Sequence, residues 1–220
     1  MKKVLDFLPN HEEFKLYQDY DMFCINSDTM ALGEFLEVYR EDVVMDFGTN
    51  TGALLLYASR FKPKKLIGVD INNDALKLAK ENMELNGITN FELINADINT
   101  FTSSEVDVII CNPPYFNEID KSNNKYKILA KNDESLKLDS LIKAIKRNLK
   151  DGGVLYFLYL SSRLEEVVLE LNKNSLAIKE MKFVYDVNKK FSNVFMVKAV
   201  KYGRHGMNVL KPLIIDRKKK

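Results

Sequence analysis

Short apolar runs alternate with amphipathic segments along the chain from residue 42 to residue 201. The apolar runs are bounded by turn-forming or charged residues, which is typical of buried strands. The segments between them repeat apolar residues every three or four positions, as helices with one buried face do. Such an alternation predicts a parallel sheet with helices packed on it. The predicted strands are 42–47, 65–70, 91–95, 106–111, 153–160, 180–186 and 193–201.

The amphipathic segments predict the helices that connect these strands. Gly87 and the Gly152-Gly153 pair stand where the C-caps of two helices are expected. The predicted crossover helices are 51–61, 72–87, 136–153 and 162–174.

The segment before the first strand is harder to interpret. A helix is expected over 29–39, and Ser27 and Asp28 are candidates for its N-cap. The first 26 residues form a lead-in without a clear pattern, although 22–26 could form a strand.

Length and composition favour one globular domain, with 220 residues of which 46% are hydrophobic and 29% charged. The longest apolar run, at 154–160, is much shorter than the roughly 20 residues that cross a membrane, and the N-terminal stretch has no signal-peptide core. We therefore expect a soluble cytoplasmic protein. The expected divisions are a lead-in with a capping helix at 1–41, the α/β domain at 42–212 and a basic tail at 213–220.

Cysteine and histidine give no sign of a disulfide or metal site. Cys24 and Cys111 are far apart and form no C-x-x-C pair, so both are expected to be reduced packing residues. The two histidines, His11 and His205, have no spacing typical of metal ligands, so no metal is expected.

The charge is distributed unevenly. Residues 187–220 contain ten Lys or Arg against the single Asp216, a net charge of +9, which leaves −7 for the preceding 186 residues because the whole chain carries +2. A basic C-terminal third beside an acidic body is compatible with a polyanionic partner such as nucleic acid. It is equally compatible with a solvated surface.

A glycine-containing loop, "DFGTNTG" from Asp46 to Gly52, follows the first predicted strand and opens a helix. Gly48 and Gly52 lie where the backbone must turn sharply and can approach a ligand closely. Asn50 stands where the usual pattern has a glycine, and asparagine adopts positive φ more readily than other non-glycine residues. The loop indicates either a nucleotide-like cofactor or a plain tight turn.

Acidic residues follow the next two strands. Asp70 lies 20 residues after Asn50, where a carboxylate can accept hydrogen bonds from both hydroxyls of a ribose. Its alternative role is a helix N-cap, which Asn72 or Asn73 could fill instead. Asp97 could bind an adenine amino group or merely cap a turn.

A stiff turn, Asn112-Pro113-Pro114-Tyr115, follows the fourth predicted strand. Proline has no N–H for a strand ladder and restricts the residue before it, so two adjacent prolines end the strand and fix the turn. The carboxyl ends of strands are where ligands bind in open α/β sheets.

Together these strand ends resemble the class I S-adenosylmethionine-dependent methyltransferases, in particular those that methylate exocyclic or amide nitrogens. The resemblance extends over nearly the whole chain from Gln18 onward. It implies a single Rossmann-like α/β domain with a seven-stranded, mostly parallel sheet, the last strand antiparallel, and helices on both faces. It also implies S-adenosyl-L-methionine as cofactor, bound by Asp46, Gly48, Asn50, Gly52, Asp70, Ile71, Asp97 and Asn112.

In this family the Asn-Pro-Pro-Tyr turn is catalytic, which implies roles for Asn112, Pro113, Pro114 and Tyr115. The amino nitrogen of adenine is a poor nucleophile because its lone pair is delocalised into the ring. The Asn112 side-chain oxygen and the Pro113 carbonyl could accept its two N–H bonds and direct the lone pair at the methyl group. Tyr115 could stack on a base taken out of its stack.

The flanking segments "YQDYDMFCINSDTMALGEFL", "LKDGGVLYFLYLSSRLEEV" and "VKAVKYGRHGMNVLKPLII" are similar to those of bacterial methyltransferases that modify adenine 37 of valine tRNA. Asn50 and the "RKKK" tail depart from that pattern. The resemblance implies tRNA as substrate. The expected RNA contacts are basic residues on or around the last two strands, Lys189, Lys190, Lys198, Lys201 and Arg204.

Two alternatives remain open from the sequence. Glutamine methyltransferases that act on release factors share the glycine loop and the four-residue turn, although they usually carry an additional N-terminal helical domain. A non-catalytic RNA-binding module would explain the basic third but gives Asn112 and Asp70 no role. The segment 117–133 could be a substrate lid or a disordered loop.

Overall fold

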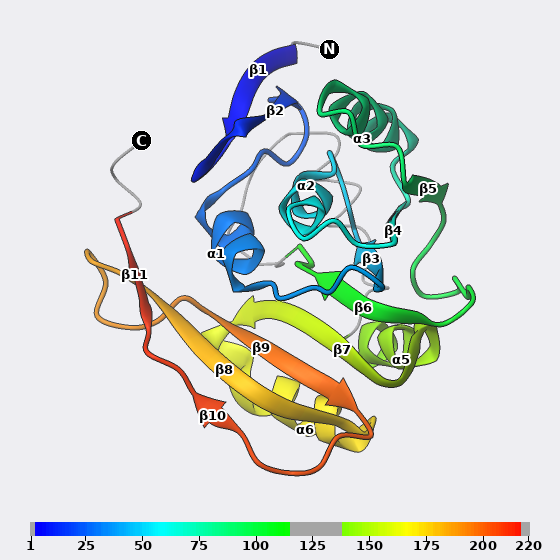
Figure 1. The fold of residues 1–220 in the computed structure, drawn as a ribbon. Helices are drawn as coiled ribbons and strands as arrows, with labels where there is room; N and C mark the ends of the chain where they lie inside the picture. The colour runs from blue at the N-terminus through cyan, green and yellow to red at the C-terminus, as the bar shows by residue number, and fades with distance from the viewer. Residues whose placement is uncertain (1–2, 115–137, 217–220) are drawn as a thin grey trace.

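The computed structural model describes residues 3–114 and 138–216, and its centre is one large sheet (Figure 1). The strand order is β10-β8-β9-β7-β6-β3-β4-β5, in which β10 spans Asn208–Val209, and β11 (Leu213–Ile215) also pairs with β8. Seven of these strands are the predicted ones: β3 (Val43–Phe47), β4 (Lys65–Asp70), β5 (Phe91–Asn95), β6 (Val106–Cys111), β7 (Leu149–Leu160), β8 (Leu176–Asp186) and β9 (Val194–Lys201).

The expected fold class is confirmed. The pairs among β5, β4, β3, β6 and β7 are parallel, whereas β9 is antiparallel to both β7 and β8. In Figure 1, β9 therefore points away from the loop that joins it to β8. Residues that follow β9 consequently emerge at the edge opposite to the carboxyl ends of the parallel strands.

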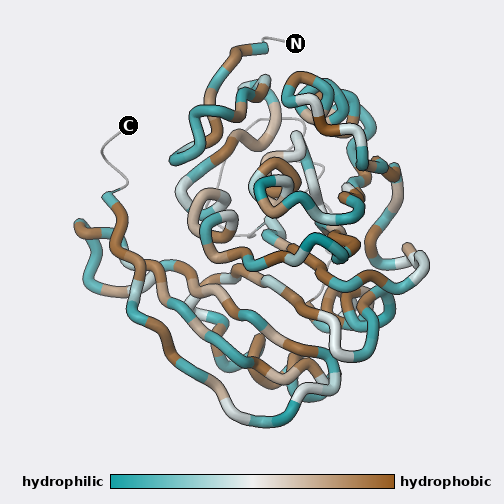
Figure 2. The backbone as a smooth tube through the Cα atoms, viewed as in Figure 1, coloured by the Kyte–Doolittle hydropathy of each residue, from teal (hydrophilic) through white to brown (hydrophobic). Residues whose placement is uncertain are grey.

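Helices cover both faces of the sheet and explain why the central strands are continuously apolar. In β3, Val44 packs in one hydrophobic cluster, and its neighbours Met45 and Phe47 pack in the other. Alternate side chains of a strand point to opposite faces, so a strand buried on both sides needs apolar residues throughout. Figure 2 shows hydrophobic stretches recurring along the sheet and hydrophilic residues in many loops.

Each helix begins within two residues of its predicted start, but the helices expected over 29–39 and 136–153 end four and five residues early. The first face carries residues of α1 (Ser27–Phe35), α2 (Ala53–Ser59) and α3 (Asn73–Leu85), and the second carries α5 (Leu138–Asn148) and α6 (Leu164–Lys173), which follows the 3-10 turn η1 (Ser161–Arg163). None of the described helices has the length and apolarity needed to cross a membrane.

The N-terminal lead-in is a β-hairpin, which the sequence did not predict. β1 (Lys3–Leu8) and β2 (His11–Asp19) pair antiparallel. The strand considered for 22–26 is wrong, because local bonds occupy its backbone: the Gln18 side-chain oxygen accepts from the Ile25 N–H at 2.7 Å, and the Met22 N–H donates to the Asp19 carbonyl at 2.9 Å.

Two predicted helix caps need correction. The N-cap of α1 is Asn26, one residue before Ser27, and its side-chain oxygen accepts from the N–H groups of Asp28 and Thr29. The Gly152-Gly153 pair lies inside β7, because α5 ends at Asn148 and the strand starts at once. Gly152, with φ 78°, sits where the register between β6 and β7 shifts. Gly87 follows α3 with φ 67°, as predicted.

Two short strands extend the sheet beyond the seven predicted. β10 (Asn208–Val209) and β11 (Leu213–Ile215) both pair parallel with β8. The first three residues of the expected basic tail thus belong to the sheet, and Ile215 is buried. An apolar triplet next to the free edge of β8 satisfies that edge's hydrogen bonds.

Candidate active site

A cavity of about 690 Å³ opens at the carboxyl ends of β3, β4, β5 and β6. It collects most residues that the sequence predicted for the site. Those that line it are Gly48, Asn50, Asp70, Ile71, Asp97, Asn112, Pro113 and Pro114. Asp46 and Gly52 are not among the lining residues, and Tyr115 and the segment 117–133 lie outside the described residues.

The loop between β3 and α2 has the strained backbone that its glycines predict. Gly48, Asn50 and Gly52 have φ of 77°, 48° and 82°. These are left-handed conformations, which cost other L-residues free energy and which glycine and asparagine tolerate. At Gly52 a Cβ would also lie 3.3 Å from the Cβ of Ala79, so the loop packs closely against α3.

Asp70 is oriented by the loop rather than by the helix after it. Its carboxylate accepts the Asn50 N–H and the Asn72 N–H, both at 2.8 Å. The N-cap of α3 is Asn72, whose side chain accepts from the N–H groups of Asp74 and Ala75. Asp70 is therefore not the N-cap of α3. Burial raises the pKa of Asp70, and its backbone hydrogen bonds oppose that shift.

Asp97 and Ile71 complete this side of the cavity. Asp97 caps the turn after β5, where it accepts the Asn99 N–H at 2.9 Å, and it also lines the cavity, so its predicted contact with an adenine stays a prediction. Ile71 is 64% exposed at the cavity wall. An exposed apolar side chain next to the acid predicted to bind a ribose suits the face of a purine ring.

Asp46 is a buried acid without a visible partner. It is 1% exposed, and neither carboxylate oxygen has a hydrogen-bond partner among the described residues, nor does the nearby Thr49 hydroxyl. Burial raises the pKa of Asp46 to about 7; hydrogen bonding from the Thr49 side chain, which lies close although outside ideal geometry, opposes this shift, and the charge of Asp70 adds to it. Thr49 lines the cavity and Asp46 does not, so the Thr49 hydroxyl is the buried polar group that a ligand in the cavity can reach.

The raised pKa of Asp46 predicts a pH-dependent stability. The folded protein holds the proton up to about pH 7, whereas the unfolded chain releases it near 3.8. The free energy of unfolding should therefore fall as the pH rises between these values and level off above them. In Asp46→Asn this contribution should vanish. Chemical denaturation from pH 5 to 8 measures it, and identical pH profiles for both proteins would contradict the burial-driven shift.

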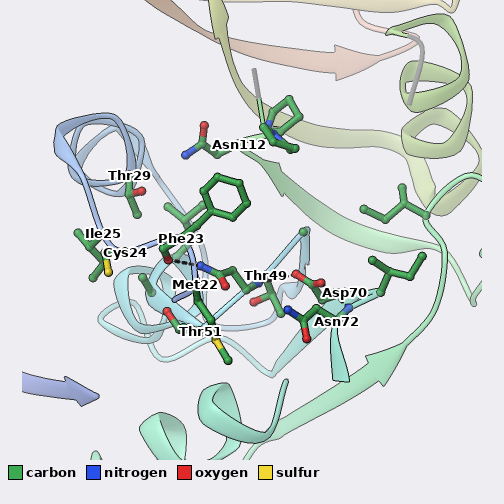
Figure 3. Close-up of a pocket in the computed structure, with 18 of the residues that line it drawn as sticks. Met22, Phe23, Cys24, Ile25, Thr29, Thr49, Thr51, Asp70, Asn72 and Asn112 are labelled. Atoms are coloured by element: carbon green, nitrogen blue, oxygen red, sulfur yellow. Dashed lines mark hydrogen bonds between the residues drawn. The ribbon is translucent and has the colours of Figure 1, made fainter. Parts of the chain in front are cut away.

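The turn after β6 forms another part of the cavity. Asn112 is half-buried, Pro113 buried and Pro114 exposed, and all three line the cavity. In Figure 3 the labelled side chains of Asn112, Phe23 and Asp70 surround the same pocket. The predicted catalytic turn and the predicted cofactor residues thus meet at one site.

One wall of the cavity was not predicted. Met22, Phe23, Cys24, Ile25, Asn26 and Thr29 line it. The Asn50 side-chain amide donates to the Phe23 carbonyl, drawn as the dashed line in Figure 3, and so ties this segment to the loop. Asn50 was the one sequence signal that could have indicated this wall, because an amide side chain in place of a glycine needs a hydrogen-bond partner from another segment.

The five predicted RNA contacts do not form one surface. Lys189 and Lys190 are exposed in the β8–β9 loop, at the same edge as the cavity. Lys198 is half-buried in the middle of β9 and pairs with Glu37.

The remaining two lie at the opposite edge. Lys201 is 6% exposed and donates to the Leu149 carbonyl at 2.7 Å, so it is poorly placed to contact phosphate. Arg204 is exposed, but it follows β9 away from the cavity. The antiparallel direction of β9 separates these two residues from Lys189 and Lys190.

Comparisons with known proteins agree with this geometry. Residues 39–209 match the family model described as a methyltransferase domain. The tRNA1(Val) (adenine(37)-N6)-methyltransferase of Pseudoalteromonas translucida is 31% identical over 162 residues, 73% of this chain and 69% of that protein. A proposed protein N5-glutamine methyltransferase of Methanocaldococcus jannaschii is 34% identical over 134 residues, 59% of this chain and 66% of that protein.

Solved structures share the fold at low sequence identity. Trm5 of Methanocaldococcus jannaschii in complex with adenosine superposes with a TM-score of 0.69 at 16% identity. The match covers 92% of this chain and 57% of that one.

Proposed function

The chain belongs to the methyltransferase-domain family that includes the tRNA1(Val) (adenine(37)-N6)-methyltransferases, and we propose that it methylates the N6 amino group of an adenine in tRNA. The methyl donor is S-adenosyl-L-methionine. The finer assignment, adenine 37 of valine tRNA, follows the names of its relatives. The observation that carries the proposal is that Asn112 lines the same cavity as Asp70 and the glycine loop.

The cavity fits S-adenosyl-L-methionine, which supplies an electrophilic methyl group on a sulfonium. The Asp70 carboxylate would accept hydrogen bonds from the ribose hydroxyls, and Ile71 and Asp97 would contact the adenine. Gly48 lets the backbone approach the ligand. A cationic ligand also suits the unpaired, buried Asp46, since a positive charge nearby favours the ionised carboxylate.

The chain's own contribution to the reaction is to position the target nitrogen. The Asn112 side-chain oxygen and the Pro113 carbonyl accept hydrogen bonds from the two N–H groups of the adenine amino group. These bonds reduce the delocalisation of the nitrogen lone pair into the ring. As the new N–C bond forms and the bond between the sulfur and the methyl group breaks, the positive charge passes from sulfur to nitrogen, where these two acceptors would stabilise it, and the neutral thioether would leave. The nitrogen then releases one proton to solvent, so no strong base is required. A stacking role for Tyr115 remains a prediction.

A direct assay separates this function from its alternatives. The purified protein is incubated with labelled S-adenosyl-L-methionine and either tRNA from a strain lacking the gene or a release factor. Label in tRNA, located by mass spectrometry as N6-methyladenine at position 37, is the expected result. Label in a glutamine of the release factor would replace the proposal, and no label in either would leave an RNA-binding module.

The basic loop at the cavity edge predicts how tRNA affinity responds to salt. Lys189→Gln with Lys190→Gln should raise the KM for tRNA several-fold and leave kcat at saturation unchanged, because phosphate contacts position the substrate without entering the chemistry. The slope of log affinity against log salt should fall by up to about 2.

A matched pair of lysines provides the control for this prediction. Lys62 and Lys64 are exposed and close in sequence, as Lys189 and Lys190 are, but they precede β4 at the opposite edge of the sheet. Lys62→Gln with Lys64→Gln removes the same charge and should leave the salt dependence unchanged. Equal effects of the two double variants would show that only net charge matters.

A further inference from the structure

An aromatic side chain stands exposed in the basic loop at the cavity edge. Phe191, in the loop 187–193 between β8 and β9, is 72% exposed. The Lys190 ammonium lies 5.5 Å from the centre of its ring, and Lys189 precedes it in the same exposed loop. A large apolar ring in water has a cost unless something covers it.

The loop is held in a defined shape, so the exposure of Phe191 is a feature of the fold. The Ser192 hydroxyl shares its one hydrogen between the carbonyls of Val184 and Val194, at 2.9 and 2.8 Å, which holds the end of the loop against both strands. On the other side, the Asn188 N–H donates to Asp186 at 2.9 Å. Phe191 lies between these two fixed points.

The loop lies at the edge of the sheet where the cavity opens. Val194, just after the loop, pairs with Leu160 at the end of β7, and Cys111, just before Asn112, pairs with Phe157 of the same strand. Two strand spacings and three residues along a strand separate Val194 from Cys111, roughly 10 Å in each direction and so about 14 Å overall. An RNA strand with one base held at Asn112 would therefore reach Phe191 within a few nucleotides.

A second exposed aromatic shows that location matters more than exposure. Tyr202 is 58% exposed, and the ammonium groups of Lys146 and Lys201 lie 5.7 and 5.6 Å from its ring centre. It follows β9, however, and so lies at the edge away from the cavity. Tyr202 is, like Phe191, an exposed aromatic ring beside lysine ammonium groups, but it lies too far from the cavity to contact a nucleotide near the bound base.

We propose that Phe191 stacks on an unpaired base of tRNA near the methylated nucleotide, with Lys189 and Lys190 contacting the flanking phosphates. A flat ring beside cations is the combination that binds single-stranded nucleic acid, because every base has a face to stack on and every nucleotide a phosphate. The exposed apolar side chains around the loop are Phe191, Val187 and Ile214 of β11, a smaller apolar surface than a stable protein interface needs. This inference rests on the proposed function.

Fluorescence tests the stacking directly, because the chain contains no tryptophan. Phe191→Trp introduces a single indole, and an anticodon stem-loop RNA should quench its emission. Tyr202→Trp is the matched control and should not be quenched by the same RNA. Equal quenching in both variants, or none in Phe191→Trp while that variant binds the RNA, would overturn the proposal. So would quenching that follows protein concentration without RNA, which would indicate a second copy as the partner.

Kinetics separates this inference from the proposed function. Phe191→Ala should raise the KM for tRNA roughly tenfold, leave kcat at saturating tRNA and the affinity for S-adenosyl-L-methionine unchanged, and Phe191→Tyr should restore the KM. If the wild-type protein methylates tRNA but Phe191→Ala has an unchanged KM, the stacking role is wrong and the function stands. If the wild type methylates no tRNA, the proposed function is wrong, and the quenching experiment alone decides whether Phe191 binds RNA.

Discussion

Asn112→Ala is expected to lower the rate of methyl transfer by about a hundredfold or more. The Asn112 side chain is the one acceptor of the turn that a substitution can remove without altering the backbone. Preorganised hydrogen-bond partners of a developing charge contribute about this factor in other enzymes. Because the contact strengthens in the transition state, kcat and kcat/KM should fall together, while tRNA affinity changes little.

Single-turnover methylation of saturating tRNA is the measurement that isolates this step. Asn112→Asp is the matched variant, since its carboxylate keeps an acceptor at the same position, and it should recover part of the rate. Cofactor affinity, measured by calorimetry, should stay within a few-fold of the wild type in both variants. A near-normal single-turnover rate in a folded Asn112→Ala protein would make the turn structural.

The architecture and the centre of the site followed from local patterns. Asp70 and Asn112 are 42 residues apart in the sequence, yet both follow strands of one parallel sheet, and the carboxyl ends of such strands meet at one edge. Identifying each strand was therefore enough to bring the two residues together. The place of Asn50 in the loop was also predictable, because that position has a positive φ, which asparagine tolerates better than most residues.

The features that were missed depend on contacts between distant segments. The wall at 22–26 exists because Gln18 and Asn50 bond its backbone, and neither bond has a sequence period to reveal it. The basic residues were grouped by proximity in sequence, but β9 runs antiparallel to its neighbours and carries Lys201 to the far edge. Charge along a chain does not show which end of a sheet it occupies.

The cofactor site has its own test at Asp70, where alanine should weaken S-adenosyl-L-methionine binding by roughly 10- to 150-fold. Losing hydrogen bonds to a charged acceptor costs about 1.5–3 kcal/mol, which corresponds to that range. Asp70 also accepts the N–H groups of Asn50 and Asn72, so its removal can loosen the loop as well as the ligand.

A cofactor analogue without ribose hydroxyls distinguishes the two effects of removing Asp70. If the carboxylate binds those hydroxyls, the wild type should lose affinity for the analogue, and Asp70→Ala should bind the analogue and the natural cofactor almost equally. If the carboxylate only orders the loop, the substitution should weaken both ligands by the same factor. Calorimetric titration of both proteins with both ligands, after thermal unfolding has shown that the variant is folded, gives this coupling directly. Unchanged affinity of Asp70→Ala for the natural cofactor would remove Asp70 from the site.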